Sequence, residues 1–389
     1  MSMRTAGACL SLIVALLLAG SSCLAGGNAV RLTITNPEPF PREGEIVSIR
    51  WQELSPLLPS PDPTLVSIRA LPAGTPVPVQ MADGALLLQV DVPGGGTKDY
   101  RIDSGAPPVS PERKVDGRFV LPRQDYAWEN DRIAFRVYGP ALAAEVRNGI
   151  DVWTKRVRSL IVEKWYRESE GSSPGNDSYH VDRGEGADFF SVGKSLGAGG
   201  AALWSGGKIH QPGVFTHWKT LADGPLRVQF ELTYDSLDLD GERYRESCRV
   251  TLDAGSNLNK IEVTYRAESA PESLLVACGL VKRAGTVATS NAAEGWLALW
   301  GPTTADSIDG KLGTGIVIPT GRFVRVAEDS LHHLILGRAE VNTPFVYYAG
   351  AGWTRSGDYT SAKDWNRYLS RWARSIAAPL RWTFSRDER

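Results

Sequence analysis

Alternating apolar and polar positions recur in short segments along the first third of this chain. Between residues 29 and 104 these segments include RLTITN, EIVSIRW, LVSIRAL and ALLLQVDV, which are rich in β-branched residues and separated by turns containing Pro and Gly. A period of two residues is typical of strands, whose successive side chains point to opposite faces. We therefore predict a small N-terminal β-sandwich of immunoglobulin-like size over residues 29–104.

The next segment, residues 105–124, combines proline with charge and has weak periodicity, so we predict a linker there. Residues 125–389 then contain longer strand-like segments, among them GPLRVQFELTYDSL, YRESCRVTLDA and SLLVACGLVK. Strands in unbroken succession indicate a large antiparallel β-sandwich rather than alternating strands and helices. The sequence thus predicts an all-β fold in which the large sandwich carries the function.

One helix is predicted near the C-terminus, in SAKDWNRYLSRWARSIAAPL. Its apolar residues Trp365, Leu369, Trp372 and Ile376 follow helical spacing, and Ser361 is placed to cap its first turn. These aromatic side chains are expected to pack the helix against the sheet. The LRWTF segment that follows is predicted to form a last strand of the large domain.

The N-terminal segment has the pattern of a signal peptide. Arg4 supplies positive charge, residues 9–20 are apolar but too few to span a bilayer, and Ala25 ends a cleavage-like triplet. We predict a signal peptide over residues 1–25 and a periplasmic or secreted protein. A loose lipobox at Cys23 leaves lipidation open, and membrane attachment is expected only in that case.

Composition narrows the classes of partner and cofactor. The 43 basic and 44 acidic residues give a net charge of -1, which is not the pattern of a nucleic-acid-binding protein. Beyond the signal peptide only Cys248 and Cys278 remain, and they could form a disulfide or stay as buried thiols. Their spacing is not that of a metal site, and the sequence predicts no cofactor.

Residues 177–208 hold the densest group of candidate catalytic side chains. Tyr179, His180, Arg183, Glu185 and Asp188 lie within ten residues and precede a Gly-rich run. Three of the five histidines of the chain, His180, His210 and His217, lie in or just after this segment. Because histidine titrates near neutral pH, such a cluster indicates a proton-transfer site.

Elimination or dehydration of a uronic acid is the first chemistry that these residues suggest. It needs a cation for the carboxylate, a base, and an acid for the leaving oxygen. We predict His180 as base or acid, Tyr179 as its partner, Arg183 as the carboxylate clamp and Glu185 as a further catalytic group. The predicted substrate-binding residues are Glu129, Arg132, Lys155, Asp188, His210 and His217.

Besides a mutarotase-like epimerase, three alternatives stay open at this stage. A glycoside hydrolase would use a pair of carboxylates drawn from Glu129, Asp182, Glu185 and Asp188. A metal site could be built from His180, Asp182, His210 and His217, although their spacing is not diagnostic. A non-catalytic protein could instead bind glycans through some of its 12 tryptophans.

Four further blocks of the chain are informative: WENDRIAFRVYGPAL, GIDVWTKR, YHVDRGEGADFFSVGKSLGAGG and DGPLRVQFELTYD. In these blocks the chain resembles a family of secreted bacterial proteins known as a domain of unknown function from polysaccharide-utilisation gene clusters. The resemblance implies a galactose-mutarotase-like supersandwich and carbohydrate processing. It further implies dehydration or lysis of acidic oligosaccharides of the ulvan type, so the expected partner is an acidic oligosaccharide.

Overall fold

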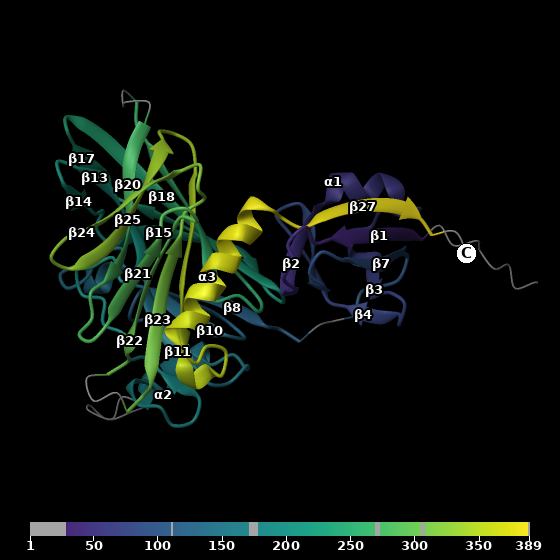
Figure 1. Cartoon of the computed structure of the whole chain (residues 1–389), viewed down its shortest axis with the longest axis horizontal. Helices are drawn as coiled ribbons and strands as arrows, with labels where there is room; N and C mark the ends of the chain where they lie inside the picture. The colour runs from purple at the N-terminus through teal and green to yellow at the C-terminus, as the bar shows by residue number, and fades with distance from the viewer. Residues whose placement is uncertain (1–28, 110–111, 171–177, 269–272, 305–307, 388–389) are drawn as a thin grey trace, which may run out of the picture.

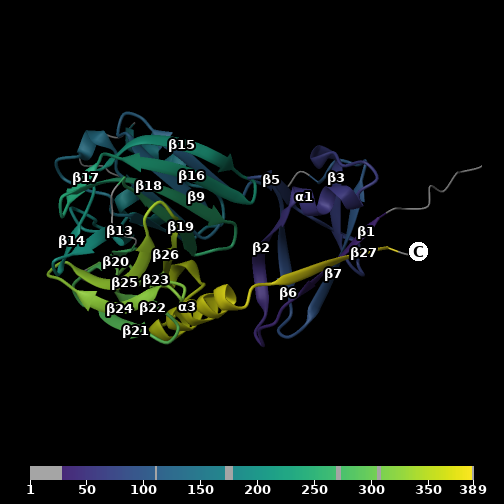
Figure 2. The ribbon, with the colours of Figure 1, turned by 90° about the horizontal axis from the view of Figure 1, so that it is seen from above.

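The computed structural model describes residues 29–109, 112–170, 178–268, 273–304 and 308–387, which form antiparallel sheets accompanied by three α-helices (Figure 1). The predicted signal peptide, residues 1–25, lies outside the described residues. No helix in the described part of the chain is long and apolar enough to cross a membrane. The fold is all-β, as predicted, with a small and a large sandwich (Figure 2).

The small sandwich packs a five-stranded sheet, in the order β27-β1-β7-β3-β4, against a three-stranded sheet, β2-β6-β5. Leu32, Ile34, Ile49, Leu86 and Ile102 are fully buried between the two sheets. The short helix α1 (Trp51–Leu54) follows β2. The strands are β1 (Val30–Thr35), β2 (Arg42–Arg50), β3 (Val66–Ala70), β4 (Thr75–Val77), β5 (Val79–Ala82), β6 (Ala85–Val92), β7 (Thr97–Ser104) and β27 (Arg381–Arg386).

Two strands belong to other parts of the fold than the sequence predicted. The C-terminal strand β27, expected in the large domain, pairs with β1 along its whole length, from Val30 opposite Arg386 to Thr35 opposite Arg381. Strand β8 (Val115–Val120), inside the expected linker, pairs with β9 in the large sandwich. Periodicity identifies a strand from its own residues, but the partner strand is set by packing elsewhere in the chain.

The large sandwich is built from three sheets. Their orders are β12-β11-β10-β9-β8, β14-β13-β20-β25-β24, and β15-β16-β18-β19-β26-β23-β22-β21 with β17 attached to β18. The strands after β8 are β9 (Asp125–Asn130), β10 (Ile133–Val137), β11 (Asp151–Lys155), β12 (Gly186–Ala187), β13 (Ala198–Ser205), β14 (Lys208–His210), β15 (Phe215–Asp223), β16 (Arg227–Tyr234), β17 (Leu237–Leu239), β18 (Glu242–Asp253), β19 (Leu258–Arg266), β20 (Ser273–Val281), β21 (Val287–Asn291), β22 (Trp296–Pro302), β23 (Lys311–Val317), β24 (Phe323–Glu328), β25 (His332–Glu340) and β26 (Phe345–Trp353).

The predicted C-terminal helix is confirmed as α3 (Ala362–Ala377), which lies across β22 and β23 (Figure 1). The Ser361 hydroxyl accepts the Asp364 N–H at 3.2 Å and caps the first turn. Trp365 and Leu369 are fully buried, and the Trp365 indole donates to the Thr314 carbonyl at 3.1 Å. The apolar face of the helix therefore packs on the sheet, as its spacing predicted.

The Gly-rich run after Asp188 has a packing role. Gly197 has a φ of +62° and bridges to Ile150, whose carbonyl oxygen lies only 2.2 Å from the place of a Cβ atom. At Gly199, a Cβ atom would lie 2.3 Å from the methyl group of Ala349. These glycines allow the backbone of β13 to approach its neighbours closely, which a larger residue would prevent.

The two modules meet through polar contacts as well as through the chain that links α3 to β27 (Figure 2). The side-chain oxygen of Gln80, on β5, accepts the N–H groups of Leu226 and Arg227 at 2.7 and 2.8 Å. Its amide nitrogen donates to the Arg227 carbonyl at 3.1 Å, and Gln89 donates to the Ala254 carbonyl at 3.3 Å. The small sandwich is thus docked on one edge of the large one.

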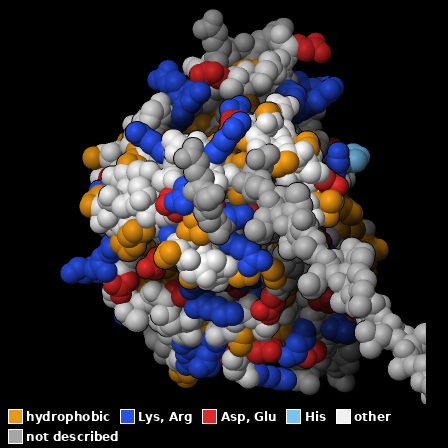
Figure 3. All heavy atoms as spheres, turned by 90° about the vertical axis from the view of Figure 1, so that its right-hand side faces the viewer, with side chains coloured by type: hydrophobic (Ala, Val, Ile, Leu, Met, Phe, Trp, Pro, Cys, Tyr) orange, Lys and Arg blue, Asp and Glu red, His pale blue; other side chains and the backbone are white. Residues whose placement is uncertain are grey.

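The two cysteines in the described part of the chain are free thiols. Cys248 on β18 and Cys278 on β20 are both buried, and burial raises their pKa values well above the usual range. Of the two states that the sequence left open, the structure has the thiols rather than the disulfide. On the face shown in Figure 3, basic and acidic side chains lie intermixed, without a large patch of one sign.

Candidate active site

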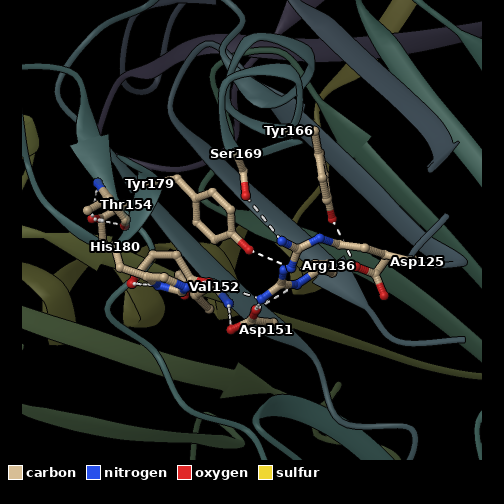
Figure 4. Close-up of polar contacts among 12 residues, drawn as sticks. Asp125, Arg136, Asp151, Val152, Thr154, Tyr166, Ser169, Tyr179 and His180 are labelled. Atoms are coloured by element: carbon tan, nitrogen blue, oxygen red, sulfur yellow. Dashed lines mark hydrogen bonds and ion pairs between the residues drawn. The ribbon is translucent and has the colours of Figure 1, made fainter. Parts of the chain in front are cut away.

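Arg136 on β10 is the centre of a buried charged network (Figure 4). Strand register places Arg136 opposite Asp151 of β11, and its Nε and Nη2 atoms donate to Asp151 Oδ2 at 3.0 and 2.5 Å. Nη2 also donates to Asp188 Oδ2 at 3.0 Å, and Nη1 lies 3.9 Å from Asp125 Oδ2. Three carboxyl groups, from three separate segments, therefore converge on one guanidinium.

Aromatic residues enclose this network. The Arg136 guanidinium lies over the rings of Tyr138 and Trp153, at 4.7 and 5.0 Å from their centroids. The Tyr138 hydroxyl donates to Asp151 Oδ2 at 2.9 Å, and the Tyr166 hydroxyl donates to Asp125 at 3.2 Å. The rings exclude water, which strengthens every electrostatic interaction inside.

Burial controls the protonation of these carboxyl groups. It raises the pKa of Asp125 to about 6, against the lowering effect of the nearby Arg136 charge. Burial, together with the negative charge of Asp151, also raises the pKa of Asp188 well above its usual range. Asp125 and Asp188 therefore keep their protons to a higher pH than exposed aspartates do.

His180 links this buried network to the surface. It ends the short 3₁₀ helix η4 (Ser178–His180), and 46% of its side chain is exposed. Its Nδ1 lies 2.9 Å from the Asp188 carbonyl oxygen and 3.7 Å from Asp188 Oδ2. Since a carbonyl only accepts, this hydrogen bond assigns the proton of the neutral ring to Nδ1 and the basic lone pair to Nε2.

The predicted proton-transfer partner Tyr179 has a different position. It is 2% exposed, stacks on Trp153 with centroids 5.0 Å apart, and its hydroxyl accepts from Arg123 at 2.7 Å. Its ring also contacts that of His180, with centroids 4.4 Å apart. Tyr179 therefore supports the histidine from inside the fold, and its buried hydroxyl is not placed to meet a substrate.

The two other predicted catalytic residues lie in the turn before β12. Arg183 is exposed and makes no ion pair with any residue that the structure describes. Glu185 is bound by Lys164, with both carboxylate oxygens 2.8 Å from Nζ, and by the Trp165 indole at 3.2 Å. The hydrogen bond from Lys164 lowers the pKa of Glu185, so this carboxylate joins α2 (Val162–Glu170) to the turn and is unsuited to donate a proton.

The structure places the predicted substrate-binding residues Glu129 and Lys155 inside the fold. Each is 1% exposed, and they form a buried ion pair at 2.5 Å. The second carboxylate oxygen of Glu129 accepts the N–H groups of Ile161 and Val162, both at 2.7 Å, at the start of α2 (Val162–Glu170). Their polar atoms are used in holding the helix to the sheet, where no substrate reaches them.

Arg132 and Asp182 are likewise engaged within the protein. Arg132 is ion-paired with Asp358, which also binds Arg158. Asp182 accepts from Arg156 at 3.1 Å and Arg355 at 3.0 Å, and its side chain is 1% exposed. Neither side chain therefore supports the binding or hydrolytic role that the sequence suggested.

His210 and His217 lie on other sheets. His210 on β14 has Nε2 3.3 Å from the Ser205 carbonyl, and His217 on β15 has Nδ1 3.1 Å from the Thr216 hydroxyl. Among the described residues, neither makes a hydrogen bond with His180 or Asp188. No group of three or more His, Cys, Asp or Glu side chains in the described part of the chain is arranged to hold a metal ion. The four residues considered for a metal site are thus not brought together.

The sequence predicts His180 and Asp188 as site residues but not Arg136, Asp151, Asp125 or Arg123. Arg136 lies in Ile-Ala-Phe-Arg-Val, where it interrupts an apolar run, and every residue of that strand is buried. An arginine inside a buried strand needs acidic partners, so this interruption is the signal that could have found the network.

The fold and the site define a two-module all-β protein with a surface histidine seated on a buried carboxylate–arginine network. The chain belongs to the family described as Domain of unknown function (DUF4861), whose model matches residues 34–381. It is 33% identical over 280 residues to "Uncharacterized protein P7" of Formosa agariphila, and the alignment covers 68% of each chain. The resemblance stated from the sequence blocks is therefore confirmed.

Two solved structures from Enterococcus faecalis are similar to this chain. One is a protein in the Glycosyl Hydrolase Family 38, with 12% identity, a TM-score of 0.48, and coverage of 92% of this chain and 47% of that one. The other is an alpha-mannosidase, with 10% identity, a TM-score of 0.44, and coverage of 93% and 46%. This chain spans less than half the length of either protein.

Proposed function

We propose that this protein is an exported carbohydrate-active enzyme that acts on acidic, uronate-containing oligosaccharides by dehydration or β-elimination. The observation that carries the proposal is the seating of His180 on Asp188, with Nδ1 2.9 Å from the carbonyl oxygen and 3.7 Å from the carboxyl. A half-exposed imidazole held in one tautomer by a backbone carbonyl has the arrangement of a general base.

The proposed step breaks a C–H bond and a C–O bond and forms a C=C bond. Nε2 of His180 removes the proton from the carbon next to the uronate carboxylate, and that electron pair forms the double bond as the neighbouring oxygen departs. The proton is returned to the leaving oxygen, which leaves as water or as a sugar hydroxyl. The backbone carbonyl of Asp188 accepts the Nδ1–H of the transient imidazolium and so stabilises it.

Arg183 is the proposed clamp for the substrate carboxylate. It is three residues from His180, it is exposed, and its guanidinium has no ion pair among the described residues. A guanidinium binds a carboxylate through two parallel hydrogen bonds, which orients the sugar as well as neutralising it. The main difficulty of this reaction is the low acidity of the C–H bond next to the carboxylate. Neutralising the carboxylate makes that C–H bond more acidic.

Product analysis tests the proposal. The purified protein is incubated with a panel of saturated and unsaturated acidic oligosaccharides, and the products are examined by mass spectrometry and ultraviolet absorbance. We expect loss of one water, or chain cleavage that creates a new conjugated double bond. Chain shortening with gain of water would instead establish a glycoside hydrolase, and binding without any turnover would establish a glycan-binding protein.

A further inference from the structure

A second feature of the large sandwich is a pocket of about 490 Å³ beside the loop that follows Asp188. Its walls come from Phe189, residues 191–195, residues 281–284 at the end of β20, residues 302–304 at the end of β22, and Leu331. This volume is within the usual range for small-molecule sites. The pocket begins at Phe189, whose peptide bond with Asp188 supplies the carbonyl that holds His180, so it borders the candidate active site.

The charged side chains that line this pocket are all basic. Lys194, Lys282 and Arg283 line it, and none of the described lining residues is acidic. On a protein whose net charge is -1, three cations around one cavity are a local concentration of positive charge. A cavity lined by charge of one sign concentrates ions of the opposite sign.

Arg283 is the most unusual of the three. Its Nη1 and Nη2 donate to the carbonyls of Pro302 and Leu312, both at 3.0 Å, while its buried Nε has no partner among the described residues. It forms no ion pair with any described carboxylate. Burial lowers the pKa of Arg283 to about 10, which still leaves it cationic at neutral pH. A desolvated cation without a counter-ion is costly, and a bound anion would remove that cost.

The two lysines stand in more open positions. Lys282 donates to the Asp329 carbonyl at 2.7 Å and pairs at 2.9 Å with Glu328, whose side chain is 64% exposed. Lys194 is exposed and has no ion pair with a described residue. Lys194 is therefore available to an incoming anion, whereas Lys282 is already partly neutralised.

We propose that this pocket binds an oxyanion of the ligand, a carboxylate or a sulfate ester of a saccharide, between Arg283 and Lys194. The inference deepens the proposed function, since it identifies where an acidic group beside the reacting sugar is held. Anion binding at the pocket does not itself require the elimination chemistry. The aromatic ring of Phe189 on the same wall gives the sugar an apolar surface, as is usual in ligand pockets.

Calorimetric titration tests the pocket directly. The probes are glucuronate, glucose 6-sulfate, inorganic sulfate and neutral glucose, and the variants are Arg283→Met and Lys194→Glu. Lys208→Glu is the matched control. Lys208 is also exposed, but it lies beyond the C-terminal end of β13, whereas the pocket residue Ser195 lies before the N-terminal end of that strand. We expect at least a tenfold loss of affinity for the preferred anion in both pocket variants and no loss in the control.

The probes distinguish a carboxylate from a sulfate ester as the bound group. Glucuronate carries a carboxylate and glucose 6-sulfate carries a sulfate ester, on similar sugars. Unchanged affinities in both pocket variants, with a lower Tm in Arg283→Met alone, would show that Arg283 only joins two backbone carbonyls and would overturn the proposal. If Arg283→Met does not fold, Lys194→Glu decides. His180→Ala should keep the anion affinity, so failure of the pocket and failure of the catalytic proposal give different results.

Discussion

Glu246 lies on β18 inside the core of the large sandwich, with 5% of its surface exposed. Burial raises the pKa of Glu246 to about 8, so at neutral pH the carboxyl group is mostly protonated. The folded state therefore binds this proton more tightly than the unfolded chain does. Its contribution to stability is complete below about pH 4.5 and is lost as pH rises toward about 8.

Replacing Glu246 by Gln should remove much of this pH dependence. Gln mimics the neutral acid, so we expect the difference in Tm between about pH 5 and about pH 8 to shrink in Glu246→Gln. Thermal unfolding at the two pH values measures it. Glu231→Gln on the neighbouring β16, where the side chain is 37% exposed, is the control and should keep the original difference. An unchanged pH dependence in Glu246→Gln would show that other groups cause it.

At the scale of single residues, part of the candidate site could be predicted from the sequence. His180 and Asp188 stood out because they lie in a polar, Gly-rich segment. Arg136 and Asp151 did not, because each lies among apolar residues of a strand, and sequence alone does not show that register places them opposite each other. Glu129 and Lys155 looked available for a substrate, and only the fold reveals that they satisfy each other.

At the scale of elements, the strands and the helix α3 were predictable from their periodicity, but β27 was assigned to the large domain. Its residues alternate as a strand should, and nothing local identifies β1, some 350 positions away, as its partner. Trp382 and Phe384 pack against the core of the small sandwich. The last strand of the chain therefore completes the first module.

Removing β27 should weaken the small sandwich selectively. A variant that ends after Leu380 leaves one edge of β1 unpaired. We therefore expect the amide protons of β1 to exchange at least about tenfold faster than in the full-length chain, with little change in β18 or β19. Hydrogen exchange followed by mass spectrometry measures this. A variant that ends after Asp387 retains the whole strand and is the control. Equal protection of β1 in both variants would mean that β27 contributes nothing to the module.

At the scale of the whole molecule, the small sandwich supports the large one, and the large one holds both candidate sites. The His180–Asp188 pair and the pocket of Arg283 share the peptide segment around Phe189. A substrate with one acidic group in the pocket and the reacting sugar at the histidine would contact both. This arrangement fits an acidic oligosaccharide better than a neutral one, because the pocket has cationic walls.

The most direct test of the account measures turnover of the substrate found by product analysis, comparing His180→Ala and Asp188→Asn with His217→Ala. We expect a fall of about 10²–10⁴-fold in kcat for His180→Ala and a smaller fall for the positioning residue Asp188, because a general base contributes that much. The exposed His217, on a different sheet, should tolerate the change, and the Tm of His180→Ala should stay near that of the natural protein. Full activity in a folded His180→Ala variant would contradict the account.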